Sequence, residues 1–598
     1  MASEKKILRI GGASGYWGDS SVGPEQLFAV DGIDVIVLDY LAEVTMSILA
    51  KAKTKDADAG YAADFVTQVI RPHLRTIAAR RIKVVTNAGG LNVAACRRAI
   101  EALAAEAGID IRVGTVEGDD VRDQVETLRD RIAELDSGAP LPDRIVSANA
   151  YLGAFPIARA LSEGADIVVT GRCVDSALVV GPLIHAFGWA ATDYDRLAAA
   201  SLAGHLLECG AQATGGNFTD WETVADHWDQ TGFPICEVEA DGSFVLTKPE
   251  GTGGVVSTLT AAEQLVYEIG DPSRYILPDV ICDFTGVTMA ADGPDRVRVA
   301  GARGLAPTPT LKVSVTYPGG YACYGSFVVA GDKAVGKARR YGEAVLAKTS
   351  RMLAARQLPP YSQTELQVIG AEGLFGDAAN PAMEQTREVV LRLCIQHPTP
   401  QGADLFSREF IGAALSMAPG LTLLSPGRPR VSPVVRLFSC LIDRDRVPVK
   451  VEVAGVPVAC ESAPVGAAEP FTGGQSVADM PMTGDLVEVP LRLLAVARSG
   501  DKGDKANIGV IARDPAYLPA IRAALTPEAI AHRFRHLVQG EVRRFDLPAV
   551  HAVNFLLDGA LGGGGASSIR LDPQAKTYAQ LLLDMPVAVP REIAPKTR

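Results

Sequence analysis

The first 190 residues alternate between short β-branched segments and longer amphipathic segments, and this alternation restricts the fold more than any other feature of the sequence. The order predicts βαβ units, which build an open, mostly parallel sheet with helices on both faces. The expected amphipathic helices include 56–81 and 93–106. The expected strands are 6–10, 35–38, 83–86, 110–116, 143–147 and 166–170. We therefore predict an α/β fold with a Rossmann-like sheet over residues 1–200.

Most of these strands are followed by a polar loop that contains glycine or asparagine. The loops are 11–20, 39–45, 87–92, 117–120, 149–156 and 171–177. In a doubly wound sheet, the loops that follow the strands gather at one edge, where ligands bind. Glycine and asparagine also make ordinary tight turns, but several such loops together favour an active-site edge. We expect Asp19, Asn87 and Asn149 to bind substrate there.

The pattern changes after residue 200. Residues 201–460 combine short β segments with glycine-bearing loops and helices near 337–356 and 404–418, which predicts a second, α+β region. Residues 461–485 are rich in Pro, Gly, Ala and Ser, as linkers are. Residues 486–590 predict a small α+β domain, with a strand at 487–497 and a loop at 499–507.

Composition excludes several functional classes. The 598 residues carry a net charge of −12, which argues against a general nucleic-acid binder. No apolar stretch is long enough to span a membrane, and the first residues lack a hydrophobic signal-peptide core. The nine cysteines are scattered without a CxxC pair, as is typical of reduced thiols. We expect a cytoplasmic protein without nucleic-acid or membrane partners. With 47% hydrophobic residues and a separate small domain, we also expect a homo-oligomer.

Cofactor motifs are lacking in the sequence. The first glycine loop has neither GxGxxG nor a Walker lysine, and Asp19 would repel a pyrophosphate. The eight histidines form no HExxH motif, so we predict no metal ligands and no prosthetic group. The alternative is a divalent-ion site formed by the carboxylates of Asp19, Glu43 and Asp175. These residues are far apart in the sequence, so their spacing does not test this alternative.

The segment GRCVDSA (171–177) follows a predicted buried strand. Arg172 can clamp a substrate carboxylate, or it can pair with Asp175 and stiffen the loop. Cys173 and Ser176 carry nucleophilic atoms, but no histidine lies within the motif to activate them. We predict Arg172 and Asp175 as catalytic residues and Cys173 as a substrate contact.

The segment GHLLECGAQATGGN (204–217) is dense in reactive side chains. His205 and Glu208 lie three residues apart, so both can face the same side of a helical turn. In a sheltered site, Glu208 would have a raised pKa and act as a general acid or base. Cys209 is either a nucleophile or a small buried thiol. We predict His205, Glu208 and Cys209 as catalytic and Asn217 as substrate-binding; a plain helix end is the alternative.

Two glycine-rich segments carry lysines that suit an anionic ligand. They are TKPEGTGG (247–254), with Lys248, and SGDKGDKAN (499–507), which repeats GDK and holds Lys502 and Lys505. Because ammonium groups and glycine amides both bind anions, we predict these three lysines as substrate-binding. The alternatives are a plain hairpin loop at 247–254 and GDK lysines that bind the acidic body of the protein. Four consecutive glycines in LDGALGGGGASS (557–568) are costly to order, which indicates either a close backbone approach or a disordered surface turn.

Long segments of the chain resemble a known family. They read IGGASGYWGDS, VVTNAGGLN, GADIVVTGRCVDSALVVGPL, GHLLECGAQATGGNF, KPEGTGGVVS and SREFIGAALSMAPG. They are similar to the acyclic terpene utilisation AtuA family. The segments ARSGDKGDKANIGVIAR and VNFLLDGALGGGGASSIRLDPQAKTYAQLLLDMPV resemble the ferredoxin-fold domain that accompanies it. The resemblance covers residues 7–450 and 486–590. It implies a role in the breakdown of citronellol- and geraniol-type acids as CoA thioesters.

This resemblance implies lyase cleavage of a branched 3-hydroxyglutaryl-CoA-type intermediate, a small-molecule acyl-CoA substrate. Retro-aldol cleavage needs a base for the 3-hydroxyl group, which we expect to be Glu208 or His205. It also needs a stabiliser for the enolate, which we expect to be Arg172 with backbone amides of 87–92 or 251–254. The alternatives are an acyl-CoA hydratase, isomerase or thioester hydrolase, and a non-catalytic subunit that organises a degradation complex.

Overall fold

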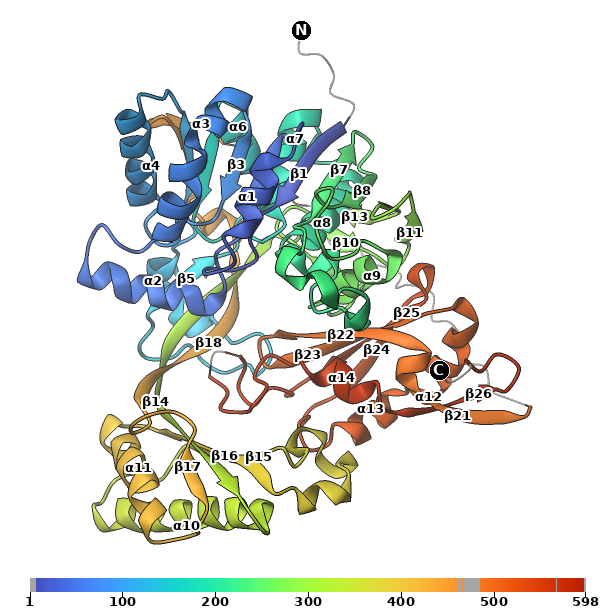
Figure 1. Ribbon diagram of the computed structural model, residues 1–598. Helices are drawn as coiled ribbons and strands as arrows, with labels where there is room; N and C mark the ends of the chain where they lie inside the picture. Colours follow the sequence, from blue (N-terminus) through green and yellow to red (C-terminus); the bar gives the residue numbers. More distant parts are fainter. Residues whose placement is uncertain (1–6, 461–464, 466–483, 566, 596–598) are drawn as a thin grey trace.

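The computed structural model describes residues 7–460, 465, 484–565 and 567–595 (Figure 1). Most of the predicted linker at 461–485 lies outside the described residues, as do Lys6 and Ala566. An α/β body carries an elongated lobe and a small C-terminal domain. None of the described helices is both long enough and apolar enough to cross a bilayer.

The body is built on a mixed sheet of eleven strands with a parallel centre. The strand order is β11-β12-β8-β7-β1-β2-β3-β6-β4-β19-β20. The five central strands, β1-β2-β3-β6-β4, are parallel to one another. The strands on either side of them, β7 and β19, are antiparallel to their neighbours β1 and β4. This confirms the α/β class, with antiparallel flanks. The bounds are Ile7–Gly12 (β1), Val35–Leu38 (β2), Lys83–Thr86 (β3), Val113–Glu117 (β4), Ile167–Thr170 (β6), Ile235–Glu239 (β7), Phe244–Thr247 (β8), Thr288–Ala291 (β11), Val297–Ala300 (β12), Lys450–Val453 (β19) and Val456–Val458 (β20).

Helices cover both faces of the parallel centre because its strands are apolar on both sides. Val35 and Val37 of β2 belong to one core, whereas Ile36 and Leu38 belong to the other. A strand buried on both faces carries a continuous apolar run, as β2 does. The helices of the body are Val22–Ala29 (α1), Glu43–Lys55 (α2), Arg71–Arg80 (α3), Val93–Ala107 (α4), Arg122–Thr127 (α5), Phe155–Ser162 (α6), Ala177–Phe187 (α7), Tyr194–Leu207 (α8) and Thr258–Val266 (α9).

Two expected elements of the body differ from the structure. The helix expected over 56–81 is shorter, because a π-helical turn at Phe65–Ile70 leads into α3. The strand expected over 143–147 is β5 (Ser147–Ala150), and it pairs with β14 rather than with the main sheet. Local sequence did not indicate this pairing because the partner strand lies in the second half of the chain.

One long strand, β14 (Thr310–Ala330), connects the body to the lobe. Its first half pairs with β5 and β18, and its second half pairs with β16 and β17. Val313 packs in the body core, whereas Phe327 packs in a separate core with the lobe helices. We call residues 321–430 the distal lobe (Figure 1). The remaining bounds of this region are Gln363–Ile369 (β15), Glu388–His397 (β16), Leu421–Leu423 (β17), Val431–Asp443 (β18), Ala334–Ala355 (α10) and Pro400–Gly412 (α11); a small sheet is formed by Tyr275–Ile276 (β9), Ile281–Asp283 (β10) and Arg303–Leu305 (β13).

The C-terminal domain combines a four-stranded antiparallel sheet, β22-β23-β25-β24, with a β21–β26 pair and three helices. This confirms the predicted small α+β domain. The strand expected over 487–497 is divided by a 3-10 turn at Leu491–Leu493, and the loop expected over 499–507 is the end of the β22–β23 hairpin. The bounds are Leu486–Pro490 (β21), Ala495–Lys502 (β22), Lys505–Ala512 (β23), Val542–Leu547 (β24), Ala552–Leu557 (β25), Pro586–Pro590 (β26), Leu518–Ala524 (α12), Pro527–Arg533 (α13) and Tyr578–Leu582 (α14).

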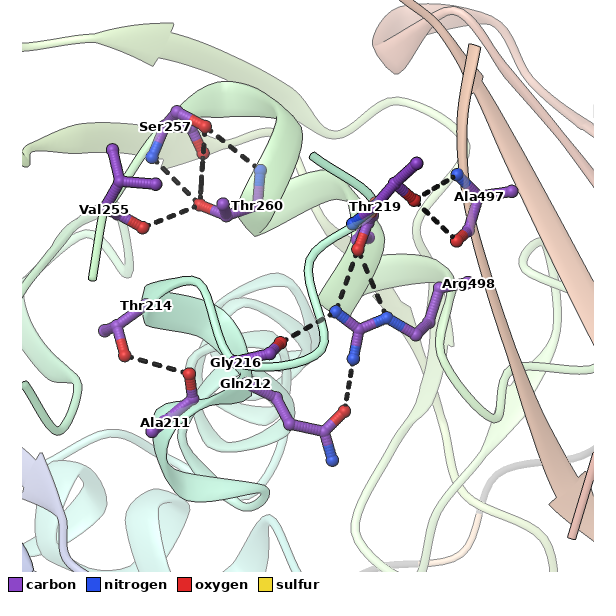
Figure 2. A network of polar contacts seen from close by, with 11 residues as sticks. Ala211, Gln212, Thr214, Gly216, Thr219, Val255, Ser257, Thr260, Ala497 and Arg498 are labelled. Carbon is purple, nitrogen blue, oxygen red and sulfur yellow. Dashed lines mark hydrogen bonds and ion pairs between the residues drawn. The ribbon is translucent and has the colours of Figure 1, made fainter. Parts of the chain in front are cut away.

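A buried ion pair fastens the C-terminal domain to the body (Figure 2). Arg498 of β22 donates from Nε and Nη2 to Glu263 Oε2 of α9, at 3.2 and 2.8 Å. The two side chains are 6% and 0% exposed. Arg498 also donates to Gln212 and to the carbonyl of Gly216, and Thr219 N donates to Glu263 Oε1. Each charge therefore has hydrogen-bond partners that offset the loss of water.

Amide side chains extend this contact along α9. Asn507 donates to the carbonyl of Val266 at 2.6 Å, and Asn554 donates to the carbonyl of Ile269 at 2.8 Å. Gly509 lies directly against Val266, where an added Cβ would be only 2.1 Å from that side chain. The sheet of the C-terminal domain thus packs tightly on the end of α9.

We expect Glu263→Gln to destabilise the domain contact by about 3 kcal/mol, because Arg498 would remain buried with its charge uncompensated. Asp220→Asn is the matched control. Asp220 pairs with Arg513 across the same contact, but the two side chains are 29% and 25% exposed. Its loss should cost about 1 kcal/mol or less. Hydrogen exchange of residues 495–502 measures the difference, and equal effects of the two variants would contradict the assignment.

Candidate functional site

Polar side chains from several strand ends meet at one edge of the parallel sheet. Asp39 follows β2, Asn87 follows β3, and Arg172 and Asp175 follow β6. Asn87 Nδ2 donates to Asp39 Oδ1 at 2.7 Å, and Arg172 Nη1 donates to Asp175 Oδ1 at 2.8 Å. Arg172 Nη1 also donates to the carbonyl of Leu41 in the loop after β2. The loops after β2, β3 and β6 are thereby joined, as the strand order predicts.

Asp119 lies beneath this edge and connects two sheets. It follows β4, and its Oδ2 accepts from the backbone N of Arg172 at 2.9 Å and from Nδ2 of Asn149 at 2.8 Å. Asn149 belongs to β5 of the second sheet. Its Oδ1 is buried without a hydrogen-bond partner among the residues that the structure describes. We call Asp39, Asn87, Asp119, Arg172 and Asp175 the strand-end cluster.

Burial dominates the electrostatics of this cluster. It raises the pKa of Asp39 well above the usual range; Asp175 adds to the shift, while Arg172 and the Asn87 hydrogen bond oppose it. Burial also raises the pKa of Asp119 to about 7, against the hydrogen bonds from Arg172 and Asn149. Two carboxyl groups at the sheet edge therefore hold protons more tightly than ordinary aspartates do.

The second group of reactive side chains lies at the end of α8. His205 is 2% exposed and Glu208 is 12% exposed, with His205 Nδ1 3.0 Å from Glu208 Oε1. Burial raises the pKa of Glu208, and His205 opposes the shift. Burial alone would lower the pKa of His205, but its contact with Glu208 outweighs this and raises it. His205 Nε2 is buried without a hydrogen-bond partner among the described residues. His205 Nδ1 also lacks a hydrogen-bond partner among the described residues, so its contact with Glu208 is a close ion-pair distance in a sheltered position.

Glycines bring the Glu208–His205 pair against the sheet edge. An added Cβ on Gly204 would lie 2.7 Å from the Cα of Ser176, and one on Gly12 would lie 2.5 Å from the carbonyl oxygen of Leu207. An added Cβ on Gly15 would touch the backbone of Cys209 at 3.0 Å. Backbones approach this closely only where side chains are absent. The loop after β1, the loop after β6 and the end of α8 therefore form one layer.

The predicted thiols lie in this layer, but their chemistry is unfavourable for attack. Burial raises the pKa of Cys173, whose Sγ is 3.6 Å from the Thr170 hydroxyl. Burial and the negative charge of Glu208 raise the pKa of Cys209. Since the thiolate is the nucleophile, neither environment activates its cysteine.

Four predicted residues are engaged in contacts of their own. Asp19 caps its loop by accepting from the backbone N of Gly15 and Ser20, at 2.9 and 2.7 Å. Asn217 is exposed and adopts a left-handed φ of 54° in a turn. Lys248 Nζ is 3.1 Å from Asp295. Lys505 Nζ is 2.7 Å from Asp136. The contacts of Asp19, Lys248 and Lys505 are structural, and Asn217 makes its turn at the surface. Of the four, the Asp19 loop packs against the backbone of Glu208 and Cys209 through Gly15.

Sequence reasoning missed Asp39 and Asp119. Both follow buried strands, and both lie in loops, 39–45 and 117–120, that the sequence marks as polar strand ends. For Asp39, the available signal was its position directly after the apolar run VIVL. A carboxylate buried at such a position needs a hydrogen-bond or charge partner. The loops were identified, but the side chain within each loop was not.

No group of three or more His, Cys, Asp or Glu side chains in the described part of the chain is arranged to hold a metal ion. The side chain of Glu43, one of three carboxylates considered for a divalent ion, lies outside the described residues. Two pockets lie away from the strand-end cluster. A pocket of about 190 Å³ is lined by residues that include Asp195, Gly242 and Gly301. A pocket of about 110 Å³ is lined by residues that include Gln367, Phe375 and Leu571.

Comparison with known families gives matches over nearly the whole chain. Residues 8–453 match the family described as "Acyclic terpene utilisation family protein AtuA", and residues 489–588 match the "AtuA ferredoxin-like domain". Neither the curated proteins nor the solved structures yield a match. The first match contains the distal lobe, β14 and all of the body except its terminal residues and β20, and the second contains most of the C-terminal domain. The chain therefore belongs to the acyclic terpene utilisation family AtuA and carries its ferredoxin-like domain at the C-terminal end.

Proposed function

We propose that the protein is an enzyme of acyclic terpenoid-acid catabolism that acts on an acyl-CoA thioester by proton transfer through Glu208. The observation that carries this proposal is the sheltered Glu208–His205 pair, 3.0 Å apart, packed against the loops that follow β1 and β6 of the parallel sheet. A carboxylate with a raised pKa is a stronger base than a free one, and it suits a proton transfer near neutral pH. Family membership supports the terpenoid substrate class.

The reaction we favour is cleavage of a branched 3-hydroxyacyl-CoA. Glu208 accepts the proton of the 3-hydroxyl group, and the bond between C2 and C3 breaks. Its electron pair moves to C2 and the thioester carbonyl, while C3 becomes a ketone or aldehyde carbon. The proton then returns from Glu208 to C2. The atoms and electrons balance without an oxidant, a reductant or water.

Other reactions of the same substrate class can use this pair. Hydration or isomerisation of an enoyl-CoA also needs a proton moved next to the thioester carbonyl. Thiol-dependent hydrolysis is less well supported, because burial raises the pKa of Cys173 and Cys209. Homo-oligomerisation, the absence of a prosthetic group and the lack of nucleic-acid and membrane partners stay predictions.

Product analysis by mass spectrometry distinguishes these reactions. We expect a branched 3-hydroxyacyl-CoA to give a shortened acyl-CoA and a carbonyl compound, with and without EDTA in parallel samples. An enoyl-CoA product would establish hydratase chemistry, and free CoA would establish hydrolysis. Binding without any turnover would indicate a non-catalytic subunit.

We expect Glu208→Gln to keep the fold and to lower kcat by about 100-fold or more, the usual scale for a general acid or base. Glutamine preserves the size of the side chain and removes the proton-accepting carboxylate. Cys209→Ser is the neighbouring control and should cause a much smaller loss, because we assign Cys209 no covalent role. The opposite ranking in the same assay, with unchanged circular dichroism, would establish covalent catalysis.

The pH dependence of kcat/KM provides a separate test. A protonated Glu208 cannot accept the hydroxyl proton, so kcat/KM should fall as the pH is lowered through its raised pKa. The residual activity of Glu208→Gln should lack this acid limb. Asp119, with a pKa of about 7, titrates in a similar range. Asp119→Asn should therefore keep the limb, and its disappearance there would reassign the limb to Asp119.

A further inference from the structure

The residues expected to stabilise negative charge at the site have other partners. The Arg172 guanidinium is buried, donates to Asp175 and Leu41, and lies 4.4 Å from the centre of the Tyr151 ring. The 251–254 glycine loop packs elsewhere: an added Cβ on Gly253 would lie 2.3 Å from the carbonyl oxygen of His227. Arg172 and the 251–254 loop are thus engaged elsewhere, which leaves the 87–92 amides and a cation from another element to stabilise a thioester enolate beside Glu208.

The C-terminal domain brings a lysine to this position. Arg498, Gly500 and Lys502 are spaced by two residues in β22, so they share one face of the strand. Arg498 forms the buried pair with Glu263 of the body. An added Cβ on Gly500 would lie 2.6 Å from the side chain of Glu268, so this strand face lies against the body there too. Lys502 extends the same face, with Nζ 3.9 Å from Glu268 Oε2.

The surroundings of Lys502 are acidic and belong to the body. Burial would lower the pKa of Lys502, but Tyr275, Glu268, Asp175 and Glu208 together outweigh it and raise the pKa well above its usual value. The ammonium group therefore stays protonated. These groups crowd the ammonium end, yet 49% of the side-chain surface of Lys502 is exposed, so solvent and ligands can reach it. Geometry supports this placement: Gln264 of α9 donates to the backbone carbonyl of His205 at 3.1 Å, and Glu268, which Lys502 contacts, follows the end of the same helix.

The hairpin that carries Lys502 is held in place by its own glycine segment. Asp504 Oδ1 accepts from the backbone N of Leu561, Gly563 and Gly564, at 3.2, 2.8 and 3.2 Å. Three converging amides form a nest that binds a carboxylate firmly. The turn after Lys502 is consequently fixed to the rest of the C-terminal domain.

We propose that Lys502 supplies, across the domain contact, the positive charge that stabilises an anionic oxygen of the ligand at the Glu208–His205 pair. The ligand group is a carboxylate or the enolate oxygen of a thioester, and the proposal rests on the proposed function for the identity of the reacting molecule. The ferredoxin-like domain is then a part of the active site. A cation in such a position is worth about 10²-fold in rate when it stabilises charge that develops in the transition state.

The first experiment tests the position of Lys502 without any substrate. The ring signal of His205 is followed by NMR over pH in protein labelled at its histidines and assigned with His205→Asn. Lys502 lowers the pKa of His205, so Lys502→Gln should raise it, and Lys502→Arg should keep it near the wild-type value. Lys505→Gln removes the same charge from the other GDK repeat, next to Asp136, and should leave the His205 titration unchanged. Identical titrations of wild type and Lys502→Gln overturn the proposal.

The second experiment tests the ligand. The probe is 3-hydroxy-3-methylglutarate, a branched 3-hydroxy dicarboxylate, whose binding is read from the His205 signal. We expect Lys502→Gln to weaken it at least tenfold and Lys502→Arg to restore most of the affinity. Equal or undetectable responses in wild type and Lys502→Gln overturn the proposal. With the thioester substrate, Lys502→Gln should lower kcat more than it changes KM. If wild type turns over no thioester while the probe still binds through Lys502, the proposed function fails and this inference stands.

Discussion

The ion pair between Arg498 and Glu263 is the interaction on which the arrangement of the two matched regions depends. Buried ion pairs contribute little net stability, because the loss of water offsets much of the attraction. Their geometry is restrictive, however, since a planar guanidinium must meet its acceptors in fixed directions. Arg498 meets Glu263, Gln212 and Gly216 at once. The C-terminal domain therefore cannot rotate on α9 without breaking several charged hydrogen bonds together.

Much of the fold and part of the site could be predicted from local sequence. The βαβ rhythm gave the parallel centre, and the three-residue spacing of His205 and Glu208 placed both on one turn, where the structure finds them in contact. These features depend only on periods of 2 and 3.6 residues. The strand β5 depends instead on pairing with β14, and no local pattern encodes a partner so distant in the chain.

The two GDK repeats illustrate why side-chain roles were harder to predict than loops. Lys502 and Lys505 each follow a Gly-Asp pair in the sequence, and they pair directly across the β22–β23 hairpin. Lys502 lies near Glu268, whereas Lys505 pairs with Asp136 and Asp558. Only the placement of the hairpin against the body separates them, and that placement comes from Arg498 and Gly500. Tertiary packing, and not the local sequence, therefore determines which acidic groups each of the two lysines contacts.

The distal lobe contacts both the body and the C-terminal domain. Strand β14 joins it to the body, while Arg392 of the lobe donates to the carbonyl of Ile569 in the C-terminal domain at 2.8 Å. The Arg498–Glu263 pair joins the C-terminal domain to the body. Each of the three parts therefore contacts the other two, and a rearrangement of one part requires at least one of these contacts to break. Ser314 of β14 pairs with Asn149 of β5. Strand β14 thus connects the distal lobe, through the backbone pairing of Ser314 with Asn149 and the side chain of Asn149, to the carboxyl group of Asp119.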